Sequence, residues 1–100
     1  MSKKVDHVVF FKLREVSEEK EKELMEELNA LPSKIEGVQT LTFGRNITPE
    51  RAKGYNYALR ATFDSREIIQ KYAIHPDHVK VATKLKELFE APPICLDWEY

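Results

Sequence analysis

The stretch Tyr72-Ala-Ile-His-Pro-Asp-His-Val79 decides how the rest of the chain is interpreted, because it combines a helix break with ionisable side chains. It contains His75 and His78, two of the three histidines in the chain. Pro76 interrupts one helix and suits the first position of the next, where its missing N–H is not needed. The stretch therefore predicts a junction between two helices, with His78 in the first turn of the second.

Four other segments carry the alternating apolar and β-branched pattern that is typical of strands. They are Val5–Leu13, Val38–Phe43, Tyr55–Phe63 and Ile94–Tyr100. The first is apolar on both of its faces, which favours burial on both sides. Between the second and third strands, residues 45–54 show no stable periodicity and are expected to form a loop.

A first helix is predicted after Ser17, which is a good N-cap residue. Leu24, Leu28 and Leu31 recur at helical spacing, and Pro32 is expected to end the helix.

Two further helices follow the third strand. Asp64 and Glu67 form a capping-box pattern that predicts a helix running through Tyr72. The helix that starts at Pro76 is expected to end at Pro92-Pro93.

The resulting order β-α-β-β-α-α-β predicts one α+β domain over residues 1–100, with a ferredoxin-like protomer and its helices on one face of an antiparallel sheet. The other sheet face would then be exposed, yet Ile94, Leu96, Trp98 and Tyr100 share one side of the last strand. A large exposed apolar face usually marks a partner surface. We therefore expect a homodimer in which two sheets pack face to face.

The composition excludes several classes of function. The chain is 42% hydrophobic and 33% charged with a net charge of −1, so no basic surface favours nucleic acid or an anionic membrane. No segment is apolar enough to span a membrane. The single cysteine, Cys95, permits no internal disulfide and is expected to be a small core residue rather than a nucleophile. A cytoplasmic protein is the default prediction, and the histidine spacing makes a weak metal motif.

The ionisable residues leave two interpretations open. His78 lies on the inward stripe of its helix, so it is either an acid–base group or a histidine at the edge of the core. Tyr72 is either a site residue or an amphipathic core tyrosine. His7 and Asp97 are polar residues within apolar strands, and they are expected either to pair beside a pocket or to form an edge salt link.

Four short motifs together resemble the stress-responsive A/B barrel domain family, a branch of the dimeric α+β barrels. They are Val5-Asp-His7-Val-Val, Gly54-Tyr55, Thr62-Phe63-Asp-Ser and Tyr72-Ala-Ile-His-Pro-Asp-His78-Val. The resemblance covers essentially the whole chain. It implies a homodimer of ferredoxin-like protomers, each with a small-molecule cavity between sheet and helices.

One activity within this family is the aldol cyclisation of a linear polyketide by a cyclase that uses neither metal nor organic cofactor. The resemblance implies that His78 is the acid–base residue and Tyr72 the polarising phenol of such a lyase-type site. It gives His7 and Asp97 supporting roles, with Asp97 orienting His78. It also implies a pocket wall formed by Met25, Leu28, Tyr57, Leu59, Ile74 and Phe89.

The wall departs from that of the cyclase, because Tyr57 replaces a histidine while Met25, Leu28 and Phe89 replace aromatic residues. The shape of the substrate therefore does not carry over. Three functions stay open: a cofactor-independent acid–base enzyme acting on a small, apolar or polyketide-like carbonyl compound, a non-catalytic ligand-binding or stress-associated dimer, and an oxygen-using monooxygenase.

Overall fold

The structure, a computed structural model, describes residues 3–100. Its elements are β1 (Val5–Leu13), α1 (Glu18–Lys34), β2 (Val38–Arg45), the 3-10 turn η1 (Pro49–Arg51), β3 (Tyr57–Phe63), α2 (Glu67–Ile74), α3 (Pro76–Lys86) and β4 (Phe89–Glu99). The strands form one antiparallel sheet in the order β2-β3-β1-β4. The predicted ferredoxin-like order is therefore confirmed.

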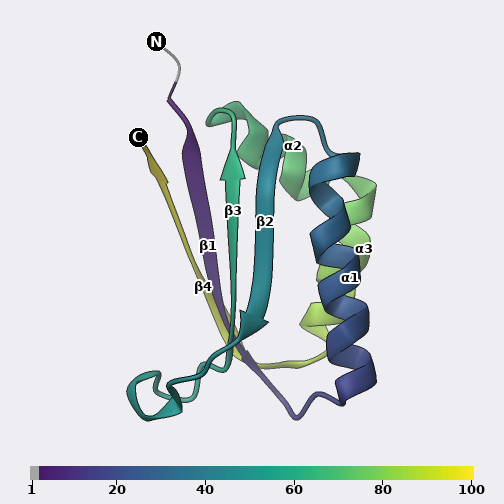
Figure 1. Cartoon of the computed structure of the whole chain (residues 1–100), viewed down its shortest axis with the longest axis vertical. Coiled ribbons are helices and arrows are strands. Elements are labelled where there is room, and N and C mark those ends of the chain that lie inside the picture. The colour runs from purple at the N-terminus through teal and green to yellow at the C-terminus, as the bar shows by residue number, and fades with distance from the viewer. Residues whose placement is uncertain (1–2) are drawn as a thin grey trace.

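The core lies between the sheet and the helices, which Figure 1 shows on one side of the sheet. Strand parity sends Val9 and Phe11 of β1 toward the helices, where they are buried with the leucine stripe of α1. Each fully buried side chain of this size stabilises the fold by about 1.5–3 kcal/mol. Within residues 3–100, no helix is long and apolar enough to cross a membrane.

No helix covers the opposite sheet face (Figure 1). Large apolar side chains on this face are exposed to solvent in the single chain. Its exposed large side chains come from β1 and β4 and are Phe10, Ile94, Leu96, Trp98 and Tyr100. The predicted exposed apolar face is therefore present.

One buried charge lies on this same open face. The Asp6 carboxylate accepts hydrogen bonds from Arg60 at 3.0 Å, from Thr62 at 3.0 Å and from the Tyr100 hydroxyl at 3.0 Å. Burial by itself would raise the pKa of Asp6, but the hydrogen bonds from Tyr100, Arg60 and Thr62 outweigh it and hold that pKa below its ordinary value. The carboxylate ties the last residue of the chain to β1.

Pro32 does not end the first helix as predicted, since α1 continues to Lys34. A proline in the last turn removes only the bond from its own nitrogen to the carbonyl of residue 28. The Ile35 amide still donates to Leu31 at 2.9 Å, which closes the helix.

The prediction that Pro92-Pro93 ends the last helix is also wrong. That helix ends at Lys86, and both prolines lie within β4, which starts at Phe89. This strand is at the edge of the sheet, where a missing N–H is tolerated, and its pairing with β1 shifts register near Lys12.

Other boundaries also differ from the prediction: β2 runs to Arg45 rather than Phe43, and β4 runs from Phe89 to Glu99 rather than from Ile94 to Tyr100. Asp64 accepts a hydrogen bond from Gln39 at 2.6 Å instead of capping α2, which begins at Glu67. Strand β3 starts at Tyr57 because the Tyr55 amide donates to a carbonyl of the preceding turn.

Candidate active site

His78 is positioned by the break between α2 and α3. His75 caps α3 by accepting a hydrogen bond from the Asp77 amide at 3.2 Å, and Pro76 is the first helical residue. His78 then falls in the first turn, with Nδ1 3.1 Å from the carbonyl oxygen of Ala73. A carbonyl can only accept, so Nδ1 carries the proton and Nε2 of the neutral ring has a free lone pair.

Burial lowers the pKa of His78 below the ordinary histidine value of 6.5. The hydrogen bond to Ala73 opposes that shift, whereas the charges of His7, His75 and Lys86 add to it. His78 is therefore neutral at pH 7, which is the state that a general base requires.

Tyr72 lies against His78, with ring centroids 4.1 Å apart. Its side chain is buried at the end of α2, and burial raises the pKa of its phenol far above the ordinary value of 10.0. The phenol therefore stays protonated near neutral pH. Only burial and the Cys95 charge act on this phenol, and no hydrogen bond does, within residues 3–100, so the hydroxyl is available as a donor to a ligand.

A cavity of about 240 Å³ lies between the sheet and α2–α3, and both side chains line it. The polar residues of its wall are His7, Tyr72, His78 and Lys86, and the remaining ones are apolar. The apolar members are Val9, Phe11, Leu28, Leu59, Ala73, Val81, Ala82, Leu85, Phe89 and Pro93. A small apolar compound with one polar centre fits such a lining.

His7 and Asp97 form a pair across neighbouring strands β1 and β4, with Nδ1 and Oδ1 2.6 Å apart. The His7 ring stacks on Phe63 at 5.4 Å and meets the edge of Tyr72 at 5.6 Å. The expected pairing of the two residues is present. Asp97 therefore orients His7 and not His78. The Nδ1 of His78 is instead bonded to the backbone carbonyl of Ala73.

Three of the residues expected in the pocket wall lie elsewhere. Ile74 is 66% exposed at the end of α2, because Ala73 takes the position facing the cavity. Met25 follows the inward Leu24 and lines a separate surface hollow beside α1.

Tyr57 is the third of these and lies near the start of β3. Its hydroxyl donates to Glu21 at 2.9 Å. Burial and this hydrogen bond raise the pKa of Tyr57 to about 12. Leu28, Leu59 and Phe89 do line the cavity.

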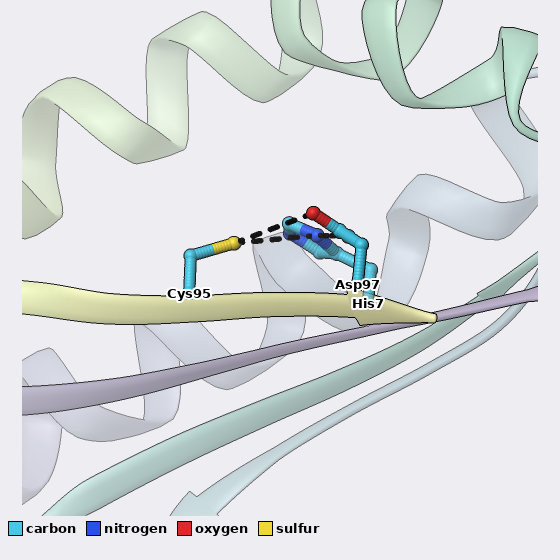
Figure 2. Close-up of side chains that lie close together, drawn as sticks. All are labelled: His7, Cys95 and Asp97. Atoms are coloured by element: carbon cyan, nitrogen blue, oxygen red, sulfur yellow. Dashed lines mark hydrogen bonds and ion pairs between the residues drawn. The ribbon is translucent and has the colours of Figure 1, made fainter. Parts of the chain in front are cut away.

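Sequence reasoning missed Lys86 in the cavity wall and misplaced Cys95. Cys95 is an exposed free thiol rather than a core residue, because β4 is an edge strand. Its sulfur lies 3.6 Å from His7 Nδ1 and 3.9 Å from Asp97 Oδ2. Figure 2 shows the three side chains on the same side of the strands. Strand parity places residues 93, 95 and 97 on one face, and this signal was sufficient to group Cys95 with Asp97.

Comparison with known proteins identifies the family. Residues 5–100 match the family described as Stress responsive A/B Barrel Domain. The chain belongs to this family. A stress-response A/B barrel domain-containing protein, HS1 of Arabidopsis thaliana, is 33% identical over 81 residues, which are 79% of this chain and 74% of that protein.

Two further similar proteins, one an enzyme and one a dimer of known structure, are relevant to activity and assembly. Olivetolic acid cyclase of Cannabis sativa is 28% identical over 88 residues, covering 86% of this A/B barrel chain and 87% of the cyclase. The crystal structure of a dimeric protein of unknown function and ferredoxin-like fold from Bacteroides fragilis is 34% identical, with a TM-score of 0.77 over 97% of this chain and 96% of that one.

Proposed function

We propose that the protein is a homodimeric, cofactor-independent enzyme that removes a proton alpha to the carbonyl of a small apolar compound. The observation that supports this most directly is the state of His78. Its Nδ1 donates to a backbone carbonyl, and its ring centroid lies 4.1 Å from that of Tyr72, whose phenol is protonated, in a largely apolar cavity. His78 is the base and Tyr72 the hydrogen-bond donor.

The reaction follows from these two groups. Nε2 of His78 takes the alpha proton, and the electron pair of the C–H bond moves into an enolate whose oxygen accepts a hydrogen bond from Tyr72. In an aldol reaction the enolate carbon then attacks a second carbonyl, and the imidazolium returns its proton to the new alkoxide. Lys86, at the edge of the same cavity, favours the negative charge of both intermediates.

The size of the cavity restricts the substrate. A volume of about 240 Å³ is below the range of about 300–1,000 Å³ found for drug-sized ligands. We propose a carbonyl compound smaller than an extended polyketide chain, although the same chemistry would close a short polyketide. We also propose a cytoplasmic protein with one functional domain over residues 1–100.

Two observations support the homodimer. The solved relative from Bacteroides fragilis is dimeric. The face of this chain that lies opposite the helices carries exposed Phe10, Leu96 and Trp98. Packing two such faces together would remove this apolar surface from water.

A second function is favoured by the apolar character of most of the wall: non-catalytic binding of an apolar ligand, in keeping with a stress-associated role. The two functions differ in one measurable property. A binding protein would hold a ketone without exchanging its alpha protons, whereas the enzyme would exchange them.

The test is exchange of alpha protons in D2O, followed by NMR with a small apolar ketone as the probe. We expect saturable exchange catalysed by the wild-type protein. His78→Ala should lower the rate by about 10²–10⁴-fold, the usual contribution of a general base. Tyr72→Phe should lower it by about 10²–10³-fold, as for a lost oxyanion donor.

His75→Asn is the matched control. It removes an imidazole close in sequence but outside the cavity wall, and asparagine can still cap α3. At pH 8, where His78 is neutral with or without the neighbouring His75 charge, its exchange rate should equal that of the wild type. Binding of the ketone without exchange, or equal exchange by the His78→Ala protein, would reject the enzyme in favour of the binding function.

A further inference from the structure

A thiol, an imidazole and a carboxylate converge on the helix-facing side of β1 and β4. One potential ligand atom each from His7, Cys95 and Asp97 lies within 4.8 Å of the others, and Figure 2 shows the side chains pointing toward one another above the sheet. Register explains the grouping, because His7 pairs with Asp97 across the two strands and Cys95 is two residues away on the same face.

This convergence does not fit a nucleophilic relay. In a Cys-His-Asp triad the carboxylate and the thiol contact different nitrogens of the ring. Here both approach Nδ1 of His7, at 2.6 Å for Asp97 and 3.6 Å for Cys95. Burial, followed by the charge of Asp97, also raises the pKa of the Cys95 thiol, which disfavours a free thiolate.

The distances are those of a chelate. For tetrahedral zinc, bond lengths of 2.0–2.3 Å place the ligand nitrogen and sulfur about 3.6 Å apart, the sulfur and oxygen about 3.6 Å apart, and the nitrogen and oxygen about 3.4 Å apart. The structure has 3.6 Å between His7 Nδ1 and Cys95 Sγ and 3.9 Å between Cys95 Sγ and Asp97 Oδ2, whereas His7 contacts the other carboxylate oxygen, Oδ1. Only the hydrogen-bonded pair of His7 and Asp97, at 2.6 Å, must open when a cation replaces the shared proton.

The three groups are also accessible and oriented. The His7 side chain is 13% exposed and that of Asp97 is 32% exposed, while Cys95 is exposed. The His7 ring is held between Phe63 and Tyr72, so its nitrogen is already directed at the thiol and carboxylate. Because Cys95 and Asp97 are exposed at the edge strand, an ion can reach them from solvent. Because the His7 ring is already held in place, its side chain need not turn to bind the ion.

We propose that His7, Cys95 and Asp97 bind a divalent zinc ion, with water in the fourth position. A thiolate and an imidazole select a borderline-soft ion over magnesium or calcium, which prefer oxygen ligands. Three protein ligands and one open position are the pattern of reactive rather than purely structural zinc sites. His7 also lines the cavity, so the ion would lie at the cavity wall.

This site shares no ligand with the acid–base pair proposed above, although His7 contacts Tyr72 and lines the same cavity. His78 and Tyr72 are not among its ligands, and their proton transfer needs no metal. The two proposals are separated by measuring alpha-proton exchange after exhaustive chelation: the acid–base proposal predicts that exchange persists, whatever the result for metal binding.

The test is titration of the chelator-treated chain of residues 1–100 with Co²⁺, which reports on tetrahedral zinc sites through its colour. We expect one equivalent to bind, with a thiolate-to-cobalt charge-transfer band in the near ultraviolet, and Zn²⁺ to displace it. Cys95→Ser should abolish that band. Competition against a chromophoric chelator should show affinity losses of at least about tenfold for His7→Gln and for Asp97→Asn.

Asp77→Asn is the matched control, since His75 and Asp77 form another histidine–aspartate couple at 3.8 Å. Its metal affinity should equal that of the wild type. Circular dichroism of each metal-free variant confirms that it is folded, and Cys95→Ser changes only an exposed side chain. Binding without the charge-transfer band, or an unchanged band in Cys95→Ser, would overturn the proposal and leave an adventitious ion only. No binding at all would overturn it as well.

Discussion

Trp98→Arg should convert the proposed dimer to monomer. Trp98 is 47% exposed in the single chain and lies on the open sheet face with Leu96 and Tyr100. A tryptophan buries up to about 250 Å², so covering this exposed part removes roughly 120 Å² from water. At about 25 cal/mol per Å², that contributes up to about 3 kcal/mol for each protomer and about 6 kcal/mol for each dimer. Losing it should weaken the dimer about 10⁴-fold.

The assay is sedimentation velocity over a range of protein concentrations. Val79→Arg is the matched control, because Val79 is likewise 47% exposed but lies on α3, away from the open sheet face. The control should sediment as the wild type does. A Trp98→Arg protein that stays dimeric at every concentration would refute the assigned interface.

Three further substitutions test the fold and the site through the free energy of unfolding, measured by urea denaturation. Tyr72→Phe should change it by less than about 0.5 kcal/mol, because no hydrogen bond to the hydroxyl is present within residues 3–100, whereas loss of a bonded hydroxyl typically removes about 1 kcal/mol. A larger loss would assign the hydroxyl to stability. Asp6→Asn should lower it by about 1–3 kcal/mol at pH 7. The pKa of Asp6 is lower in the folded protein than its ordinary value of 3.8, which applies to the unfolded chain. The difference in unfolding free energy should therefore be complete above pH 3.8 and should vanish as the pH falls through the folded-state pKa. A difference that does not change with pH would contradict the ionised network. Gly37→Ala should lower the free energy of unfolding by about 1–3 kcal/mol, because Gly37 has φ of +93° and an added Cβ would overlap the Ile68 side chain. An unchanged free energy of unfolding would show that the backbone there can relax.

The topology and the sheet faces were predictable because they depend on local periodicity. Alternation in Val5–Leu13 sends His7 and Val9 to one face, and the same rule places Asp97 on that face of β4. The element ends were less predictable. Proline disfavours a helix interior because it lacks an N–H. Pro32 is nevertheless tolerated in the last turn of α1, and Pro92 is tolerated in the edge strand β4, because each position loses a single hydrogen bond.

Within the site, periodicity identified His78 and Tyr72 as inward but could not determine their partners. Whether Asp97 reaches His7 or His78 depends on strand register, which is set by the whole sheet rather than by local sequence. The exposure of Cys95 likewise depends on β4 being an edge strand. The family resemblance placed Ile74 and Met25 in the wall, but the direction of each side chain depends on its helical turn.

The most direct test of the account is an NMR titration of His78 in the isotope-labelled protein, with ring nitrogen shifts assigned by comparison with His78→Ala. We predict a pKa below 6.5, because burial outweighs the hydrogen bond to Ala73. In the neutral form we predict a proton on Nδ1 and none on Nε2, because Nδ1 donates to the Ala73 carbonyl. Since the base form is then populated below the pH at which an ordinary histidine charges, alpha-proton exchange should persist into that range and fall only as His78 is protonated. A His78 that is protonated at neutral pH, or a neutral ring with its proton on Nε2, would contradict the assignment of His78 as the base.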